Sequence, residues 1–138
     1  FPLGMPEPSM SPEPSAKPSG VLELGSRQRS QAPPPEIIWE ALTDPYRPKG
    51  RQWLTLARDE VPPRILESIE PRLVVWSSLW PSRPNDQIRF DIAGDQSGSM
   101  LRWTLLSPDD PPDRALLGHL RYRLNFLING ELRLSFGQ

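Results

Sequence analysis

The feature that most constrains the fold of this chain is a pair of neighbouring segments with a strict two-residue period. Every second residue is apolar in residues 86–92 (DQIRFDI), and the same alternation runs from Leu101 to Leu105 within residues 99–106 (SMLRWTLL). Successive side chains of a strand point to opposite faces, so this pattern buries one face and leaves the other in solvent. The connecting AGDQSG has a composition typical of a hairpin turn. The two segments therefore predict an antiparallel hairpin.

Four other short segments also predict strands, and they follow one another closely along the chain. They are residues 20–32, 53–59, 64–70 and 72–80, of which the last two end at Pro71 and Pro81. Consecutive short strands with short connections favour an antiparallel meander. A meander with one apolar face needs another element to cover that face.

The C-terminal segment, residues 114–136, predicts the helix that covers the sheet. Its apolar stripe consists of Leu116, Leu120, Leu124 and Ile128. Residues four apart lie on one face of a helix, and the preceding SPDDPPD provides acidic residues suited to a helix start. Gly118 and Gly130 weaken this helix and predict a kink near Gly130 or a close approach to the sheet.

A short helix is predicted between the first and second strands, in residues 32–45 (APPPEIIWEALTDP). Proline in the first turn costs no helical hydrogen bond, and the Asp44–Pro45 pair ends the helix. A second short helix or turn is predicted over residues 46–51. Because such short helices are unstable alone, we expect them to close one end of the sheet. The predicted fold is α+β: a curved antiparallel sheet wrapped around a long C-terminal helix, with two short helices after the first strand.

The chain divides into a tail and one domain. Residues 1–19 contain PEPS twice and few apolar side chains, so burial cannot offset the entropy of ordering them. We interpret them as a disordered tail rich in Pro, Ser and Glu, and the FPLG before Met5 is consistent with a remnant of cloning. Residues 20–138 are expected to form a single domain with one core.

Composition excludes several classes of function. The 138 residues contain 16 Lys and Arg against 17 Asp and Glu, a balance that does not fit a nucleic-acid-binding protein. The lack of cysteine excludes disulfides and zinc sites with sulfur ligands, and the single histidine, His119, excludes a multi-histidine metal site. No apolar run approaches the roughly 18 residues of a membrane span. We expect a cytoplasmic monomer or homodimer without a metal or cofactor.

Three segments of the sequence resemble a known family. PPPEIIWEALTDP is similar to the entry motif of the START-like helix-grip (SRPBCC) superfamily, RILESIEPRLVVWSSL resembles its paired strands, and IRFDIAGDQSGSMLRWTLL resembles its last hairpin. Within that superfamily the chain looks most like the polyketide cyclase/dehydrase-like and heat-shock-chaperone ATPase-activator-like branch. The resemblance covers residues 20–138. One departure is the Gly98–Ser99–Met100 sequence where relatives often have Gly-Gly-Thr, which implies a different cavity mouth.

The resemblance implies a ligand cavity between the sheet and the C-terminal helix. Such a cavity is mostly apolar with a few polar groups that orient the ligand. The candidates for its wall are Trp53, Trp76, Phe90, Arg102, Trp103, His119, Leu120, Tyr122, Leu124 and Phe126. Phe90 and Trp103 are the best of these, because they share the inward phase of adjacent strands. The alternative for each aromatic residue is that it simply fills the core.

Two polar candidates have alternative interpretations. Arg102 interrupts an apolar strand; it either points outward into solvent or points inward, where it would pair with a carboxylate or phenolate of a ligand. His119 is a candidate general base, and its candidate partners are Asp91, Glu67, Arg102 and Tyr122. A surface position is the alternative for His119. No catalytic residue is assigned.

The leading hypothesis is a protein that binds a small hydrophobic ligand, such as a lipid, a polyketide or another apolar metabolite, in this cavity. The alternative is a polyketide cyclase- or aromatase-like enzyme, and a further alternative is a protein-interaction module like that of chaperone activators. An open cavity above about 300 Å³ favours ligand binding. Arg102 and His119 around one void would favour the enzyme, and a filled core with an exposed apolar sheet face would favour the interaction module.

Overall fold

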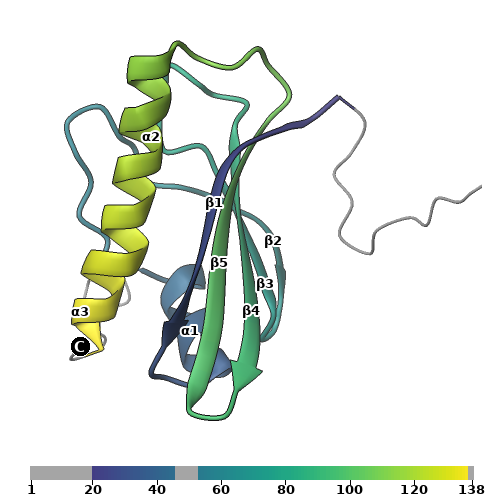
Figure 1. The fold of residues 1–138 in the computed structure, drawn as a ribbon, viewed down its shortest axis with the longest axis vertical. Helices are drawn as coiled ribbons and strands as arrows, with labels where there is room; N and C mark the ends of the chain where they lie inside the picture. Colours follow the sequence, from purple (N-terminus) through teal and green to yellow (C-terminus); the bar gives the residue numbers. More distant parts are fainter. Residues whose placement is uncertain (1–19, 46–52, 137–138) are drawn as a thin grey trace, which may run out of the picture.

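The computed structural model describes residues 20–45 and 53–136 (Figure 1). The elements in chain order are β1 (Leu22–Gln31), α1 (Pro35–Thr43), β2 (Ile65–Ile69), β3 (Leu73–Ser77), β4 (Gln87–Asp95), β5 (Gly98–Ser107), α2 (Arg114–Phe126), a π-helical segment η1 (Leu127–Leu132) and α3 (Arg133–Ser135). The five strands form one antiparallel sheet in the order β1-β5-β4-β3-β2. The predicted tail and the predicted second short helix lie outside the described residues.

The hairpin with the two-residue period is confirmed as β4 and β5. Its last pair is Asp95 opposite Gly98, with the turn at Gln96 and Ser97. Gly98 is required there, because a Cβ at that position would lie 2.3 Å from the Gln31 carbonyl oxygen. The hairpin end therefore packs directly against the end of β1.

The buried core lies on one face of the sheet, beneath α2 (Figure 1). On this inner face, Val74, Phe90 and Trp103 are neighbours across β3, β4 and β5. Leu120 and Leu124 of α2 are fully buried in the same cluster. The predicted arrangement, a one-sided sheet covered by a one-sided helix, is confirmed.

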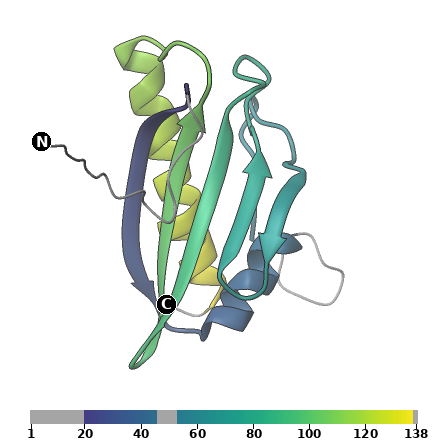
Figure 2. The same cartoon turned by 90° about the vertical axis from the view of Figure 1, so that its right-hand side faces the viewer.

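The short helix α1 closes one end of the sheet, beside the β4–β5 hairpin turn (Figure 2). Its last carbonyl groups have no partner within the helix. Two tryptophans supply partners: Trp53 Nε1 donates to the Ala41 carbonyl at 2.9 Å, and Trp76 Nε1 donates to the Leu42 carbonyl at 2.8 Å. The C-terminal end of α1 is thus bonded to the core by buried indoles.

The predicted strand at 53–59 is wrong. Trp53 and Leu54 are both buried, so consecutive side chains enter the core and the alternation of a half-buried strand is lost. The chain then turns, with the Glu60 N–H donating to the Ala57 carbonyl at 3.0 Å. The segment lies along the core without pairing to the sheet.

The predicted strand at 72–80 is shorter in the structure and ends at Ser77. Ser78 Oγ accepts a hydrogen bond from the Trp80 N–H at 3.0 Å, which turns the backbone away from the strand direction. This turn buries Leu79 and Trp80 fully. Apolar residues that looked like a continuation of the strand therefore belong to a loop packed on the core.

The C-terminal helix is confirmed as the continuous run of α2, η1 and α3. It begins at Asp113, whose Oδ1 accepts a hydrogen bond from the Leu116 N–H at 2.8 Å. Near Gly130 the structure has the π-helical segment η1, and a Cβ on Gly130 would meet only Phe126, at 3.9 Å. The helix is therefore irregular near Gly130, but Gly130 does not approach the sheet closely. No described helix is both long and apolar enough to cross a membrane.

Candidate ligand groove between β1 and α2

A bulge in β1 shapes the candidate site. Glu23 pairs with Leu106 and Gly25 pairs with Leu105, so Leu24 is an extra residue in the strand. A bulge reverses the side-chain phase of the residues that follow it. Arg27 consequently pairs with Trp103 and shares its inner face. Without the bulge, Arg27 would lie on the outer face.

Beyond the bulge, a groove of about 530 Å³ separates β1 from α2. Its lining residues are Gly25, Ser26, Arg27, Trp103, Gly118, Arg121, Tyr122 and Asn125. Two glycines line the groove. A Cβ at Gly118 would meet nothing within 4 Å, whereas a Cβ at Gly25 would lie 2.9 Å from Arg121 Nε.

Trp103 provides both the aromatic wall of the groove and a buried hydrogen-bond donor, its Nε1–H. The residue is only 3% exposed, and its buried Nε1 has no hydrogen-bond partner among the described residues. A buried N–H without an acceptor costs free energy, because it loses its bond to water. An acceptor atom in the groove would satisfy it.

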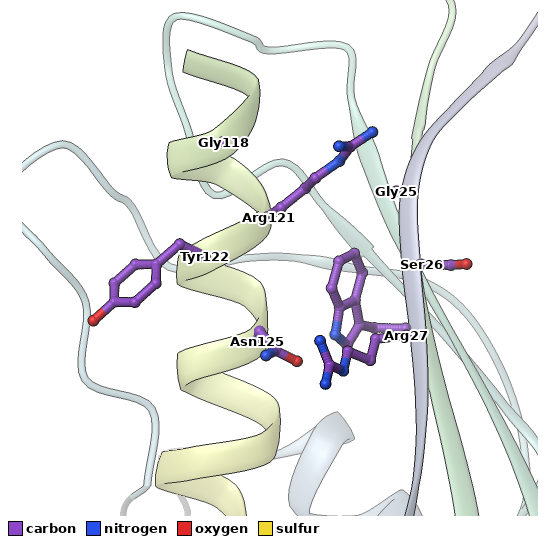
Figure 3. Close-up of a pocket in the computed structure, with 8 residues that line it drawn as sticks. Gly25, Ser26, Arg27, Gly118, Arg121, Tyr122 and Asn125 are labelled. Atoms are coloured by element: carbon purple, nitrogen blue, oxygen red, sulfur yellow. The ribbon is translucent and has the colours of Figure 1, made fainter. Parts of the chain in front are cut away.

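Two basic residues lie beside this wall. Arg121 Nε donates to the Leu24 carbonyl at 2.8 Å, so the bulge residue supplies its acceptor. Arg27 extends from β1 toward Asn125 on α2, while Ser26 and Tyr122 point away from the groove (Figure 3). The groove is therefore lined by an indole, an amide and two guanidinium groups.

A polar seam continues along the same edge toward α3. Asn129 Nδ2 donates to Asn125 Oδ1 at 2.7 Å, and Gln31 Nε2 donates to Asn129 Oδ1 at 3.2 Å. Arg133 Nη1 donates to the Ser30 carbonyl at 2.6 Å. The helix is thus joined to the edge strand by polar bonds, whereas apolar side chains join it to the centre of the sheet.

The structure separates the sequence-predicted wall residues into groups. Trp76 lies between Trp53, stacked at a centroid distance of 6.0 Å, and Phe90, edge-on at 4.7 Å. These three rings, with Leu120 and Leu124, pack together in the core. Among the predicted wall residues, Trp103 lines the groove with its ring, and Tyr122 borders it with its ring pointing away (Figure 3).

The side chains of Tyr122 and of the remaining candidates lie on the surface. The Tyr122 and Phe126 rings stack on each other at 6.2 Å, and both residues are exposed. Arg102 is exposed on the outer face, opposite Asp91, and lines a separate hollow of about 350 Å³. His119 Nε2 lies 3.0 Å from Asp59 Oδ2, a partner absent from the predicted set. Arg102 and His119 therefore do not surround one void.

Sequence reasoning missed Arg27, Arg121 and Asn125. The available signal was Gly25, because a glycine inside a strand pattern often marks a bulge or a close backbone approach. Once the bulge is placed at Leu24, the inward position of Arg27 follows from the two-residue period.

A buried ion pair holds the opposite side of α2. Arg123 Nε and Nη2 donate to the two carboxylate oxygens of Glu60 at 2.8 and 2.9 Å, and Trp80 Nε1 donates to Glu60 Oε2 at 3.2 Å. Burial by itself would raise the pKa of Glu60, but the hydrogen bonds from Arg123 and from the Ala57 N–H, with the Arg123 charge, lower this pKa below its usual value. The irregular segment after α1 is thereby tied to the helix.

The antiparallel sheet, the helix α1 after its first strand and the C-terminal helix that covers it define a helix-grip domain. Its open groove lies at the edge of the sheet, between β1 and α2. CalU16 from Micromonospora echinospora has a similar structure, with a TM-score of 0.55 at 18% identity over 81% of each chain. A Staphylococcus aureus protein of unknown function gives 0.61 at 12% identity, covering 85% of this chain and 94% of its own.

A third similar structure is the Aha1 dimer from Colwellia psychrerythraea, with a TM-score of 0.51 at 16% identity, covering 77% of this chain and 96% of that one. No family model and no curated protein matches the sequence. The resemblance to the START-like helix-grip superfamily is confirmed at the level of the fold.

Proposed function

We propose that this protein binds a small, largely apolar ligand in the groove between β1 and α2. The observation that carries the proposal is the wall of the groove: Trp103 presents a buried aromatic surface together with an Nε1–H that has no partner. Ligand sites combine aromatic or aliphatic walls with a few placed polar groups, and this groove combines an indole wall with an amide and two guanidinium groups. The groove volume of about 530 Å³ is within the usual range for such sites.

The residues of the groove favour binding over catalysis. Its described lining contains neither histidine nor carboxylate, so it offers no base of the usual kind beside a nucleophile. Arg102 and His119 around one void would favour the cyclase-like alternative, but Arg102 lines a hollow on the outer face and His119 lies beside Asp59. The interaction-module alternative needs an apolar outer face, whereas the outer positions of β4 and β5 include Arg89, Asp91 and Arg102. The exposed large apolar side chains of the sheet lie on its edge strands β1 and β2. The cytoplasm stays the compartment predicted from the sequence.

The proposal is tested by fluorescence titration with N-phenyl-1-naphthylamine, an uncharged apolar dye. Wild-type protein is expected to bind the dye saturably, and Trp103→Ala is expected to weaken binding about tenfold or more, because the wall is removed. Trp39→Ala, on α1 and outside the groove, is the matched control and should bind like the wild type. Far-UV circular dichroism checks that each variant is folded. Absence of saturable binding to the wild type, or equal binding by folded Trp103→Ala, would overturn the proposal.

A further inference from the structure

We infer that the ligand carries a carboxylate, and that Arg27 and Trp103 Nε1 together bind it in the groove. This inference rests on the proposed function and names the chemical class of the ligand: an apolar body with one anionic group. It depends on the donors that line the groove, on the charge of that lining and on the bulge that orients Arg27.

The polar groups that the groove leaves available are hydrogen-bond donors. Trp103 Nε1 has no partner within the part of the chain that the structure describes, and an indole N–H can only donate. Asn125 uses its Oδ1 to accept from Asn129, which leaves its NH₂ group for the groove. A guanidinium can also only donate. A lining made of donors selects a ligand group rich in acceptors.

The charge of the lining selects an anion among such groups. Arg27 and Arg121 are its ionised residues, and the described lining contains no carboxylate to neutralise them. Arg121 Nε is already bonded to the Leu24 carbonyl. For Arg27, no side-chain hydrogen bond or ion pair exists with any other described residue. Arg27 is therefore the cation free to pair with a ligand.

The strand register brings the two groups together. Arg27 and Trp103 are directly opposite partners on β1 and β5, and both face α2. Cβ atoms of such partners lie about 5 Å apart. The two oxygens of one carboxylate can therefore accept from the guanidinium and from the indole N–H simultaneously, and charge-assisted bonds of this kind are among the stronger ones.

The fold places this basic residue specifically in the groove. Arg102 lies one strand position from Trp103 but faces the opposite side of the sheet. The sequence offered Arg102 either as an outward, solvated residue or as an inward arginine that pairs with a ligand carboxylate. The bulge at Leu24 assigns that inward position to Arg27.

The experiment compares two probes that differ in one charge: 11-(dansylamino)undecanoic acid and its methyl ester. With full-length wild-type protein at low ionic strength, the acid is expected to bind about tenfold tighter than the ester. Arg27→Gln should lower the affinity for the acid to that for the ester and leave the ester unaffected. Arg102→Gln removes the same charge from the outer face, and it should retain the preference for the acid.

A second variant tests the indole N–H. Trp103→Phe keeps an aromatic wall but removes the donor, so the ratio of acid to ester affinity should fall severalfold while ester binding persists. Equal affinity of the wild type for acid and ester would overturn the inference and leave the proposed function standing. Equal losses in Arg27→Gln and Arg102→Gln would also overturn it, since they indicate a general charge effect. If folded wild-type protein binds neither probe, both proposals fail.

Discussion

At the scale of single residues, the backbone around β1 determines most of the site. Gly25 adjoins the bulge, and Gly98 lies where the hairpin end meets the end of β1. Ser99, in the segment that departs from the family pattern, donates its hydroxyl to the Pro33 carbonyl at 2.6 Å. This departure thus joins the β4–β5 hairpin to the entry of α1. A residue that looked relevant to the cavity mouth has a structural partner instead.

Alanine at two glycines should have opposite effects on stability. Gly98→Ala is expected to destabilise the protein by about 3 kcal/mol, because its Cβ would collide with the backbone carbonyls of Gln31 and Ala32. Gly118→Ala is expected to stabilise it by about 0.5–1 kcal/mol, since a methyl group there meets nothing and alanine favours the helix. Urea unfolding measures both. A stable Gly98→Ala would show that the hairpin is not held against β1.

At the scale of elements, α1 depends on residues far from it in sequence. It buries Ile38, Ala41 and Leu42, and indole donors satisfy the carbonyls at its C-terminal end. Nine residues would not form a stable helix alone. The helix therefore forms because the core supplies both its apolar contacts and the partners for its last carbonyls.

Trp76→Phe tests this dependence. Phenylalanine keeps most of the ring contacts with Phe90 but leaves the Leu42 carbonyl without a donor, so a loss of about 2 kcal/mol is expected. Trp39→Phe is the matched control: its longer 3.3 Å bond to the Leu73 carbonyl is partly exposed, and its loss should cost less. Chemical denaturation followed by far-UV circular dichroism gives both values. Equal costs would argue against indole bonding of α1.

At the scale of the whole molecule, α2 is held differently on its two sides. Toward the irregular segment it is fixed by the Glu60–Arg123 pair, and toward β1 it is joined by the polar seam with the groove beside it. The Glu60 side chain is fully buried, so removing one partner leaves a buried charge unpaired. A buried ion pair therefore anchors α2 on the side of the irregular segment, and polar bonds join the helix to β1 on the side of the candidate groove.

The ion pair predicts how stability depends on pH. Because the folded-state pKa of Glu60 is lowered, its contribution is present above the unfolded value of about 4.3 and is lost as pH falls through the folded value. Glu60→Gln should lower stability at pH 7 by about 2 kcal/mol, and the gap to wild type should narrow on acidification.

The measurement is the Tm as a function of pH between roughly 3 and 7, which spans the ordinary pKa range of carboxylates. The exposed Glu67→Gln on β2 is the control, and at pH 7 it should stay within about 0.5 kcal/mol of wild type. A gap between Glu60→Gln and wild type that is independent of pH would contradict the lowered pKa of Glu60.

The local pattern of the sequence determined the class of fold. The two-residue period identified β4 and β5, the four-residue spacing identified the C-terminal helix, and prolines marked the short helix. These signals are local, because they depend on which face of each element is buried. That the sheet and the C-terminal helix must cover each other follows from their single apolar faces.

Only the tertiary structure decided where the candidate groove lies and that its lining carries positive charge. The extra residue at Leu24 reverses the phase of β1 and turns Arg27 inward, while Arg102 faces outward. The Glu60–Arg123 contact joins residues 63 apart, and no periodic pattern encodes such a distance. Periodicity reports burial of an element's face, whereas pairing and register depend on the packing of the whole chain. The basic groove is a product of that packing.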